Sequence, residues 1–358
     1  MRSVVYIAAP AGIYTGGPTA LFQLCDAFRT VFGVDARIAF VGTRKDFDPV
    51  HPHYKEFNCK WVPLGKIEDT SCNLLIIPET MPWLLNKFKY LRKILYFLAV
   101  DYFVYSVYTN FSNFSSRTFT LMDTMNSITM KFLMKFITIN KFYKNQFYAL
   151  IVQDIIRRRN SVLSKFLSRK DVSLFIAQSK YAVEFLKSLG IPQSEIILVR
   201  EPLEEYIRRK AMEIDLSQKV NAIAWNSRKA YPIALKLIKR LRRKYKVFEL
   251  LNVGRENMIK ILSLTKVFID IGIHPGRDRP PREAVALGNV VFVNNHGGMF
   301  YPEDFDAPPG YKINCYCSCR GVDLDELCER VEYAIENFDE VVKLFEGLRE
   351  YVVYREPQ

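Results

Sequence analysis

Residues whose side chains bind phosphate or hydroxyl groups gather in one short stretch of the chain, residues 270–298. A pattern typical of a buried strand, Val267 to Ile271, is followed by a charged loop and by a helix that opens with Pro280 and Pro281, residues suited to a first helical turn. In parallel α/β sheets this place favours anions, because backbone N–H groups and the helix dipole point toward it. The stretch therefore predicts a site for a phosphorylated ligand.

Arginine and lysine side chains in two places could bind the phosphate groups of such a ligand. Arg277, Arg279 and Arg282 surround the start of the predicted helix, where the two prolines remove backbone N–H donors. Arg228 and Lys229 follow an earlier predicted strand, and the guanidinium of Arg228 could bind phosphate in a bidentate manner. Solvated surface charge explains either group as well. Both groups are candidate phosphate ligands.

A histidine and two glycines complete the candidate site. His274 stands at the end of the predicted strand, where a neutral imidazole could hydrogen-bond a sugar or phosphate, or simply pack. Gly297 and Gly298 follow the next predicted strand and permit positive φ angles or the close approach of a ligand. A plain turn accounts for the two glycines equally well.

Strand-like and amphipathic segments alternate along the chain, which predicts βαβ units around parallel sheets. The first series of predicted strands is Val4–Ala8, Arg37–Val41, Leu74–Ile77, Ile94–Val100 and Leu174–Ala177. The second series is Ala222–Trp225, Phe248–Val253, Val267–Ile271 and Val290–Val293. A strand-like run ending at Arg200 separates the two series.

The predicted fold class is therefore α/β, with two Rossmann-like doubly wound domains facing a cleft. We expect one domain over residues 1–203, a second over 204–340, and a carboxyl-terminal helix over 341–358 that could pack back on the first domain. Helices are predicted over Ile233–Tyr245, with Leu235, Ile238 and Leu241 toward the sheet, and over Leu324–Phe338 and Glu340–Tyr354.

Two doubly wound domains with a nucleotide-type loop in the second resemble the GT-B glycosyltransferases. The run PPREAVALGNVVFVNN resembles the second half of a motif of the retaining members, two glutamates separated by seven residues. Glu283 occupies the second glutamate's position, with Pro280 and Ala284 in place, and Pro275 occupies the first. The resemblance implies that Glu283 holds the ribose hydroxyls of a nucleotide-sugar donor.

The resemblance also suggests roles for residues outside this motif. Asp278, His274 or Asp270 could replace the missing first glutamate. In AIAWNSRKA, Arg228 and Lys229 stand where the family grips the donor pyrophosphate. The amino-terminal run AAPAGIYTGGPTALFQLCDAF resembles the family's glycine-rich loop, in which Gly16 and Gly17 let the backbone approach donor and acceptor.

Basic charge is concentrated in residues 81–170, which hold 15 basic and 3 acidic residues of a chain with net charge +13. Lys and Arg alternate there with Phe and Tyr, a composition that suits an anionic membrane surface. Because GT-B enzymes with lipid-linked acceptors often dock through the first domain, the resemblance implies a lipid-linked or polyanionic glycan acceptor. Nucleic acid would call for the same residue types, but no nucleic-acid module is present. An ordinary basic surface over an aromatic core is a further explanation. Asp101 is the candidate to contact the acceptor hydroxyl.

Other features bound the class of protein. The 49% apolar and 25% charged content is that of a folded globular chain, and no apolar segment reaches the roughly 20 residues of a spanning helix. The seven cysteines lack the spacing of a secreted disulfide scaffold, and Cys315, Cys317 and Cys319 lack a second ligand pair for zinc. We expect a cytoplasmic protein, with a peripheral position at the inner face of the membrane as an option.

The sequence thus predicts a retaining, hexosyltransferase-like enzyme that moves a sugar from a nucleotide-sugar to a glycan or lipid-linked acceptor, in cell-surface polysaccharide synthesis. No metal and no cofactor are expected, because Arg228, Lys229 and helix-start amides would stabilise the leaving diphosphate. One alternative is a non-catalytic protein that binds membrane or polyanion on a degenerate GT-B scaffold. Another is a metal-dependent transferase that uses an aspartate pair, Asp46 and Asp48, Asp304 and Asp306, or Asp323 and Asp325.

Overall fold

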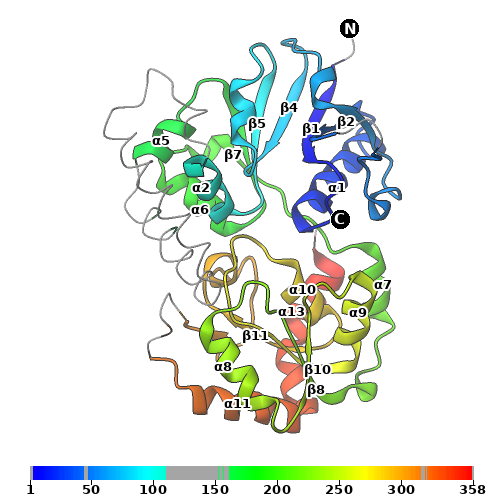
Figure 1. The fold of residues 1–358 in the computed structure, drawn as a ribbon, viewed down its shortest axis with the longest axis vertical. Helices are drawn as coiled ribbons and strands as arrows, with labels where there is room; N and C mark the ends of the chain where they lie inside the picture. The colour runs from blue at the N-terminus through cyan, green and yellow to red at the C-terminus, as the bar shows by residue number, and fades with distance from the viewer. Residues whose placement is uncertain are drawn as a thin grey trace. The chain divides into compact units, whose positions relative to one another are not determined.

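The computed structural model describes residues 3–43, 47–109, 152, 156, 161–315, 319 and 321–356. The chain forms two units, Met1–Met134 with Ile155–Glu201 (unit 1), and Lys135–Asp154 with Pro202–Gln358 (unit 2). Each unit is built on its own sheet of parallel strands with helices packed against it (Figure 1). The predicted α/β class with two Rossmann-like units is therefore confirmed.

Unit 1 has a sheet in the order β3-β2-β1-β4-β5-β6-β7 among its described residues. Because β1 pairs with both β2 and β4, the chain changes its direction of travel across the sheet at this point. The strands are β1 (Val5–Pro10), β2 (Ala36–Val41), β3 (Lys60–Pro63), β4 (Leu74–Pro78), β5 (Arg92–Phe97), β6 (Val172–Ala177) and β7 (Ile196–Leu198). The helices are α1 (Gly16–Thr30), α2 (Val100–Thr109), α5 (Ser161–Leu167) and α6 (Lys180–Ser188), with shorter 3-10 turns at η1 (Pro52–Tyr54), η2 (Leu64–Lys66), η3 (Pro82–Asn86) and η5 (Gln193–Glu195).

Unit 2 has a sheet in the order β12-β11-β10-β8-β9 among its described residues. The strands are β8 (Val220–Trp225), β9 (Lys246–Glu249), β10 (Thr265–Asp270), β11 (Val290–Asn294) and β12 (Lys312–Ile313). The helices are α7 (Glu205–Met212), α8 (Pro232–Leu241), α9 (Arg255–Leu264), α10 (Arg279–Ala286), α11 (Leu324–Glu336), α12 (Phe338–Val341) and α13 (Glu346–Glu350), with 3-10 turns η6 (Leu216–Gln218), η7 (Gly297–Phe300) and η8 (Val342–Phe345) and a π-helical turn η9 (Tyr351–Arg355).

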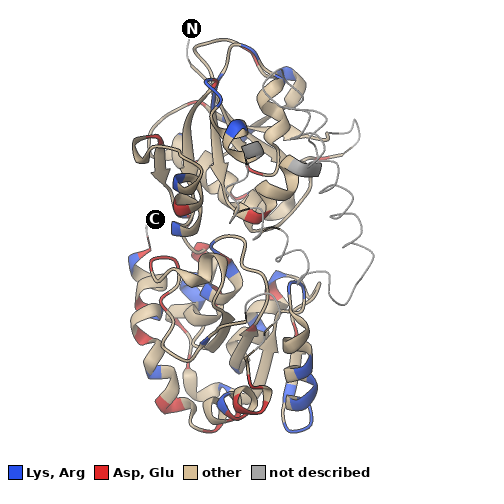
Figure 2. Cartoon of the chain, turned by 90° about the vertical axis from the view of Figure 1, so that its left-hand side faces the viewer, with Lys and Arg blue, Asp and Glu red and all other residues tan. Residues whose placement is uncertain are grey.

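Three local predictions need correction. Strand β5 ends at Phe97, so Asp101 lies in the first turn of α2 and not at the end of a strand. Strand β3 was not predicted, because Lys60 and Trp61 are exposed and give no apolar pattern. In α8 the predicted Ile238 and Leu241 are buried, but Leu235 is only half-buried and Leu237 is buried in its place, and the outer face of the helix is strongly basic (Figure 2).

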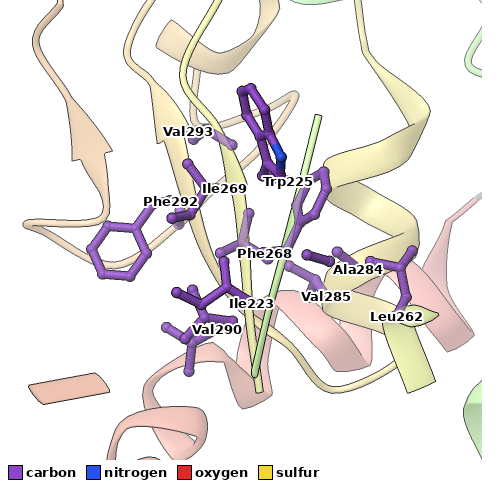
Figure 3. Close-up of a cluster of buried hydrophobic side chains, with 14 of the residues drawn as sticks. Ile223, Trp225, Leu262, Phe268, Ile269, Ala284, Val285, Val290, Phe292 and Val293 are labelled. Atoms are coloured by element: carbon purple, nitrogen blue, oxygen red, sulfur yellow. The ribbon is translucent and has the colours of Figure 1, made fainter. Parts of the chain in front are cut away.

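The core of unit 2 lies around the three central strands of its sheet. Ile223 of β8, Phe268 of β10 and Phe292 of β11 are fully buried, and Val285 of α10 packs against the same sheet (Figure 3). Burial on both faces explains why these strands are near-continuous apolar runs in the sequence. The packed core fixes the ends of β8 and β10, from which the candidate site is built.

The carboxyl-terminal segment belongs to unit 2. Arg349 donates from Nε to the carbonyl of Ala286 (3.1 Å) and from Nη2 to that of Ala211 (2.7 Å). Arg208 of α7 donates to the carbonyl of Val353 (2.9 Å). The segment is thus tied to α7 and α10, while its predicted packing on the first domain stays a prediction.

Among the residues placed by the structure, no helix is both long and apolar enough to span a bilayer. Residues 110–151, 153–155 and 157–160, which make up most of the basic block 81–170, lie outside the described residues. The predicted membrane contact of that block therefore stays a prediction.

Candidate functional site

The candidate site lies in unit 2, where β8 and β10 end side by side. The chain leaves β8 toward one edge of the sheet and leaves β10 toward the other, so this is a switch point of the topology. Ligands of open parallel sheets bind outside the carboxyl ends of strands at such points. The loop after β8 (226–231) and the loop after β10 (271–278) meet here, with Tyr231 N donating to Ile271 O (3.0 Å) and Ile273 N to Lys229 O (3.2 Å).

Three glycines let the loops of the site pack closely. A Cβ on Gly272 would lie 2.6 Å from the carbonyl carbon of Lys229, which real side chains do not tolerate. At Gly297, which has a φ of +59°, a Cβ would overlap the carbonyl oxygen of His274. At Gly298 a Cβ would overlap the carbonyl oxygen of Gly276. The close neighbour of the two predicted glycines is therefore protein backbone.

Lys229 and Asp278 form the centre of a polar cluster at the switch point. The ammonium of Lys229 lies 3.1 and 3.0 Å from the two carboxylate oxygens of Asp278, and Asp278 Oδ2 lies 3.0 Å from His274 Nδ1. Asn226 donates to Asp270 Oδ2 at 3.1 Å. Burial opposes ionisation of Asp278, but the charge of Lys229 and the hydrogen bond with His274 outweigh it and lower its pKa. The cluster brings together the predicted residues Lys229, His274, Asp278 and Asp270.

Both ring nitrogens of His274 face acceptors. Nδ1 faces the ionised carboxylate of Asp278, and Nε2 lies 3.0 Å from the backbone carbonyl of Asp270. Because neither partner donates, the arrangement favours the protonated imidazole, in which both nitrogens are donors. Burial lowers the pKa of His274, yet the Asp278 hydrogen bond and the Asp270 charge more than reverse this and raise it. His274 is thus placed to orient Asp278, and its predicted contact with a sugar or phosphate stays a prediction.

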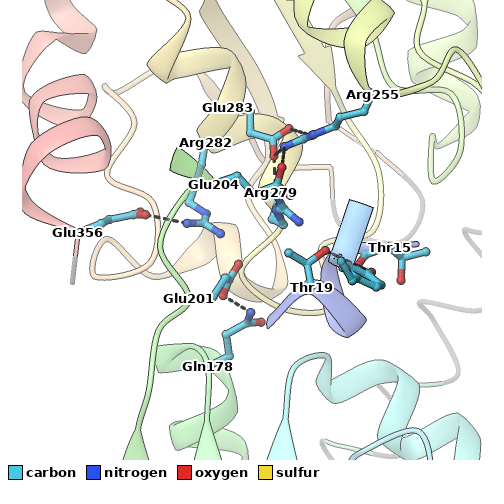
Figure 4. A network of polar contacts seen from close by, with 11 residues as sticks. Thr15, Thr19, Gln178, Glu201, Glu204, Arg255, Arg279, Arg282, Glu283 and Glu356 are labelled. Carbon is cyan, nitrogen blue, oxygen red and sulfur yellow. Dashed lines mark hydrogen bonds and ion pairs between the residues drawn. The ribbon is translucent and has the colours of Figure 1, made fainter. Parts of the chain in front are cut away.

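Glu283 lies in α10 within a network of ionic contacts (Figure 4). Its two oxygens accept from Arg255 Nη2 (2.6 Å) and Nη1 (2.7 Å), and Arg279 Nε lies 3.4 Å from Oε1. Glu204 pairs with Arg279 and lies 3.4 Å from Arg255. Burial would raise the pKa of Glu283, but the charges of Arg255 and Arg279 prevail and lower it. Glu283 is an ionised carboxylate with no exposed surface.

The other arginines of the stretch have a different partner. Arg277 and Arg282 both pair with Glu356 near the carboxyl terminus, with Arg282 Nη1 at 2.8 Å, and the side chains of all three are almost fully buried. Arg282 is therefore held by protein, and donor contact by this residue stays a prediction. Arg228 lies at the surface of the loop after β8, where its backbone N donates to Asn226 Oδ1 at 3.2 Å.

The candidates in unit 1 lie at the carboxyl edge of its own sheet. Gly16 and Gly17 are the first residues of α1, directly after the loop that leaves β1 at the switch point. Asp101 is buried in α2 and accepts from the hydroxyl of Tyr181 at 3.0 Å. Their predicted contacts with donor and acceptor stay predictions.

Three charged residues of these clusters, and the buried Glu79 of unit 1, were not predicted from the sequence. Arg255, Glu204 and Glu356 are separated from their partners by 28 to 79 residues, so no local pattern links them. Gly254 before Arg255 has a φ of +75° and marks the start of α9, which is the one local signal for Arg255. Glu79 follows β4 in unit 1 and accepts from Leu98 N at 3.1 Å, and its burial raises its pKa to about 8.

Among the described residues, no three His, Cys, Asp or Glu side chains are grouped so that they could hold a metal ion. Cys315 and Cys319 lie after β12 and form a disulfide bond, a pairing that their spacing did not predict, and Cys317 lies outside the described residues, as does Asp46.

Known proteins resemble the chain in fold but not in sequence. No protein-family model matches the chain, and no curated protein matches its sequence. Solved structures with a similar fold include OtsA in its apo form (TM-score 0.57, 11% identity, 99% of this chain and 96% of that chain). Anabaena HepE in complex with UDP-glucose (0.55, 11%, 99% and 95%) and the lipopolysaccharide outer core galactosyltransferase WaaB in its apo form (0.53, 9%, 99% and 96%) are also similar. At these identities the likeness concerns the fold alone, and the chain has the GT-B fold.

Proposed function

We propose that the chain is a glycosyltransferase that moves a sugar from a nucleotide-sugar donor to a glycan or lipid-linked acceptor, in cell-surface polysaccharide synthesis. Unit 2 binds the donor and unit 1 carries the acceptor. The observation that carries this proposal is Lys229, which Asp278 holds at the switch point of the unit 2 sheet. The fold supports it, because HepE has been solved with UDP-glucose and WaaB is a galactosyltransferase.

The donor diphosphate lies beside the ends of β8 and β10 in this proposal. Arg228 and Lys229 supply cationic groups from one loop. Arg279 supplies a backbone N–H group at the start of α10, where the two prolines that follow it have none. These fixed donors stabilise charge on the leaving diphosphate without a metal ion, since preorganised hydrogen-bond donors perform this role in other active sites.

Glu283 and Asp101 have distinct roles in the proposed transfer. The Glu283 carboxylate accepts from the donor ribose hydroxyls, while Arg255 keeps it ionised and oriented. Asp101 accepts a hydrogen bond from the attacking acceptor hydroxyl. The bond between the anomeric carbon and the diphosphate oxygen breaks as the acceptor oxygen bonds to that carbon, with retention of configuration, and the proton of the acceptor hydroxyl passes to the leaving diphosphate. Asp278 and His274 position Lys229 against the leaving oxygen.

Calorimetry of the full chain with a panel of nucleoside diphosphates tests the proposal. We expect one base to bind clearly best, and we expect a chelator to leave its affinity unchanged. Lys229→Ala should weaken binding, whereas Lys260→Ala, which removes an exposed cation from α9 of the same unit, should not. Binding of no nucleotide would contradict the proposal, and loss of binding with the chelator would favour a metal-dependent transferase.

A second candidate function is a non-catalytic protein that binds membrane or polyanion through residues 81–170. The observation that favours it concerns Glu283. This carboxylate is fully buried, and both of its oxygens already accept hydrogen bonds from Arg255. Nucleotide binding that is absent, or that Glu283→Ala leaves unchanged, would favour this candidate.

A further inference from the structure

Helix α8 and the turn that follows it carry a group of cations that the proposed transfer does not use. From Leu216 to Phe248 the chain has ten basic residues and no acidic one. Seven of the ten lie between residues 236 and 246, and all seven are exposed: Lys236, Lys239, Arg240, Arg242, Arg243, Lys244 and Lys246. Packing does not require so many positive charges on one short segment, but binding to an anionic partner would.

The periodicity of α8 puts three of these cations, Lys236, Lys239 and Arg240, on one side, and the other four follow the end of the helix at Leu241, with Lys246 as the first residue of β9. Ala234, Leu237, Ile238 and Leu241 are buried against unit 2, while basic residues three and four positions apart occupy the opposite side of the helix. Figure 2 shows the resulting run of basic residues along one helix of this unit. The apolar side suffices to hold α8 on the sheet, so packing does not require the charges.

Counter-charges from the same unit reach only part of this side. Arg240 pairs with Asp325, and Lys244 pairs with Glu332 (2.6 Å) and Glu336 (2.7 Å), all three acids coming from α11. The other five cations form no ion pair with any residue that the structure describes: Lys236, Lys239, Arg242, Arg243 and Lys246. We name these five the α8 cations. Like charges on adjacent turns repel one another, so this arrangement weakens the isolated helix.

We propose that the α8 cations bind the surface of an anionic lipid bilayer. This contact uses other residues than the donor site and the block 81–170, and it holds whether or not the chain transfers sugar. Lys and Arg side chains near a membrane are attracted by the negative potential of anionic headgroups. Between Pro232 and Phe248 no large apolar side chain is exposed, so the contact is electrostatic, at the level of the headgroups and without insertion.

A single-stranded nucleic acid is the less suitable partner because this side lacks rings for base stacking. The hydroxyl of Tyr245 donates to Glu336 at 3.1 Å, and Lys246 lies over the half-buried ring of Phe248 with Nζ 4.9 Å from its centroid. Proteins that bind single strands combine a basic groove with aromatic side chains on which bases stack. The α8 cations offer charge alone, which matches a lipid surface of closely spaced phosphates.

Sedimentation of the full chain with lipid vesicles tests the proposal. We expect binding to vesicles of phosphatidylcholine mixed with phosphatidylglycerol, no binding to phosphatidylcholine alone, and weaker binding as salt is raised. Each Lys or Arg near such a surface contributes about fivefold to affinity, so R242E/R243E should weaken binding by more than about 20-fold. K236Q/K239Q, a milder change, should weaken it by about 20-fold as well.

The matched control is R209E/K210E on α7, which changes the net charge of unit 2 by the same amount as R242E/R243E at exposed positions outside the α8 cations. This control should bind vesicles nearly as the unmodified chain does. Equal loss in the control, no loss in either α8 variant, or no vesicle binding at all would overturn the proposal. Tighter binding of the unmodified chain to a nucleic-acid oligonucleotide than to anionic vesicles at the same salt would overturn it too. Far-ultraviolet circular dichroism confirms that the variants fold.

Discussion

Lys229 and Asp278, 49 residues apart in the sequence, join the loop after β8 to the start of α10 through two contacts of 3.0 and 3.1 Å. Both side chains are partly accessible, at 23% and 13%. His274 holds the same carboxylate from the buried side. Alone, the carboxylate of Asp278 would repel a diphosphate. Paired with Lys229 and His274, it fixes the position of the Lys229 ammonium.

Lys229→Ala should remove a phosphate ligand and leave Asp278 as a negative charge at the site. Charge-assisted hydrogen bonds contribute about 1.5–3 kcal/mol, so we expect the affinity for inorganic pyrophosphate to fall about 10- to 100-fold. Calorimetry with pyrophosphate measures this directly, with Lys260→Ala as the control. An equal affinity of the unmodified chain and Lys229→Ala would remove Lys229 from the donor site.

Glu283→Gln separates ribose binding from phosphate binding. If Glu283 accepts from ribose hydroxyls, the variant should bind a nucleoside diphosphate about tenfold more weakly, because two charge-assisted hydrogen bonds become neutral ones. Its affinity for inorganic pyrophosphate should stay the same, since pyrophosphate has no ribose. A parallel loss for both ligands would instead assign to Glu283 only the support of Arg255 and Arg279.

The sequence allowed the strands to be predicted where burial dictates their composition. β10 and β11 are buried on both faces, and their apolar runs were found almost to the residue. β3, with Lys60 and Trp61 exposed, has no such pattern and was missed. The switch point that locates the site was likewise invisible, because strand order depends on pairing between distant segments.

The residues of the candidate site could be predicted only where a local sequence pattern reveals them. Lys229, His274, Asp278 and Glu283 stand next to strand ends or a helix start, which local patterns reveal. Their partners come from elsewhere, so the sequence could not show that Arg255 occupies both oxygens of Glu283. Nor could it show that both ring nitrogens of His274 face acceptors.

His274→Gln should destabilise the fold more in acid than in base. The pKa of His274 is raised above its ordinary 6.5 by Asp278 and Asp270, against the opposing effect of burial. A raised histidine pKa adds stability that is complete below pH 6.5 and is lost as the pH rises through the folded-state value. Urea unfolding should therefore show a larger loss, about 1–3 kcal/mol, at pH 6 than at pH 9. The exposed His53→Gln serves as control, and a loss that does not change with pH would mean that the imidazole is neutral.

Gly272→Ala should disturb the junction of the two loops. Its Cβ would meet the backbone of Lys229, which cannot rotate away, so we expect a loss of about 1–3 kcal/mol in unfolding free energy. Gly65→Ala is the matched control, because a Cβ there meets nothing within 4 Å. Nucleotide affinity should fall only in Gly272→Ala. If both variants keep full stability and affinity, the loops adapt easily and their junction does not define the site.

Glu79→Gln should stabilise unit 1 near neutral pH. Burial raises the pKa of Glu79 from 4.5 to about 8, so the folded chain keeps this carboxyl protonated while the unfolded chain ionises it. Stability is then greatest below pH 4.5 and declines as the pH rises toward 8, which costs the native chain about 3 kcal/mol at pH 7. Glutamine does not ionise and escapes this cost. Its advantage in urea unfolding should therefore be present at pH 7 and absent at pH 4.5. The exposed Glu68→Gln should show no such pH dependence, and an equal effect of Glu79→Gln at both pH values would mean that Glu79 is ionised in the folded chain.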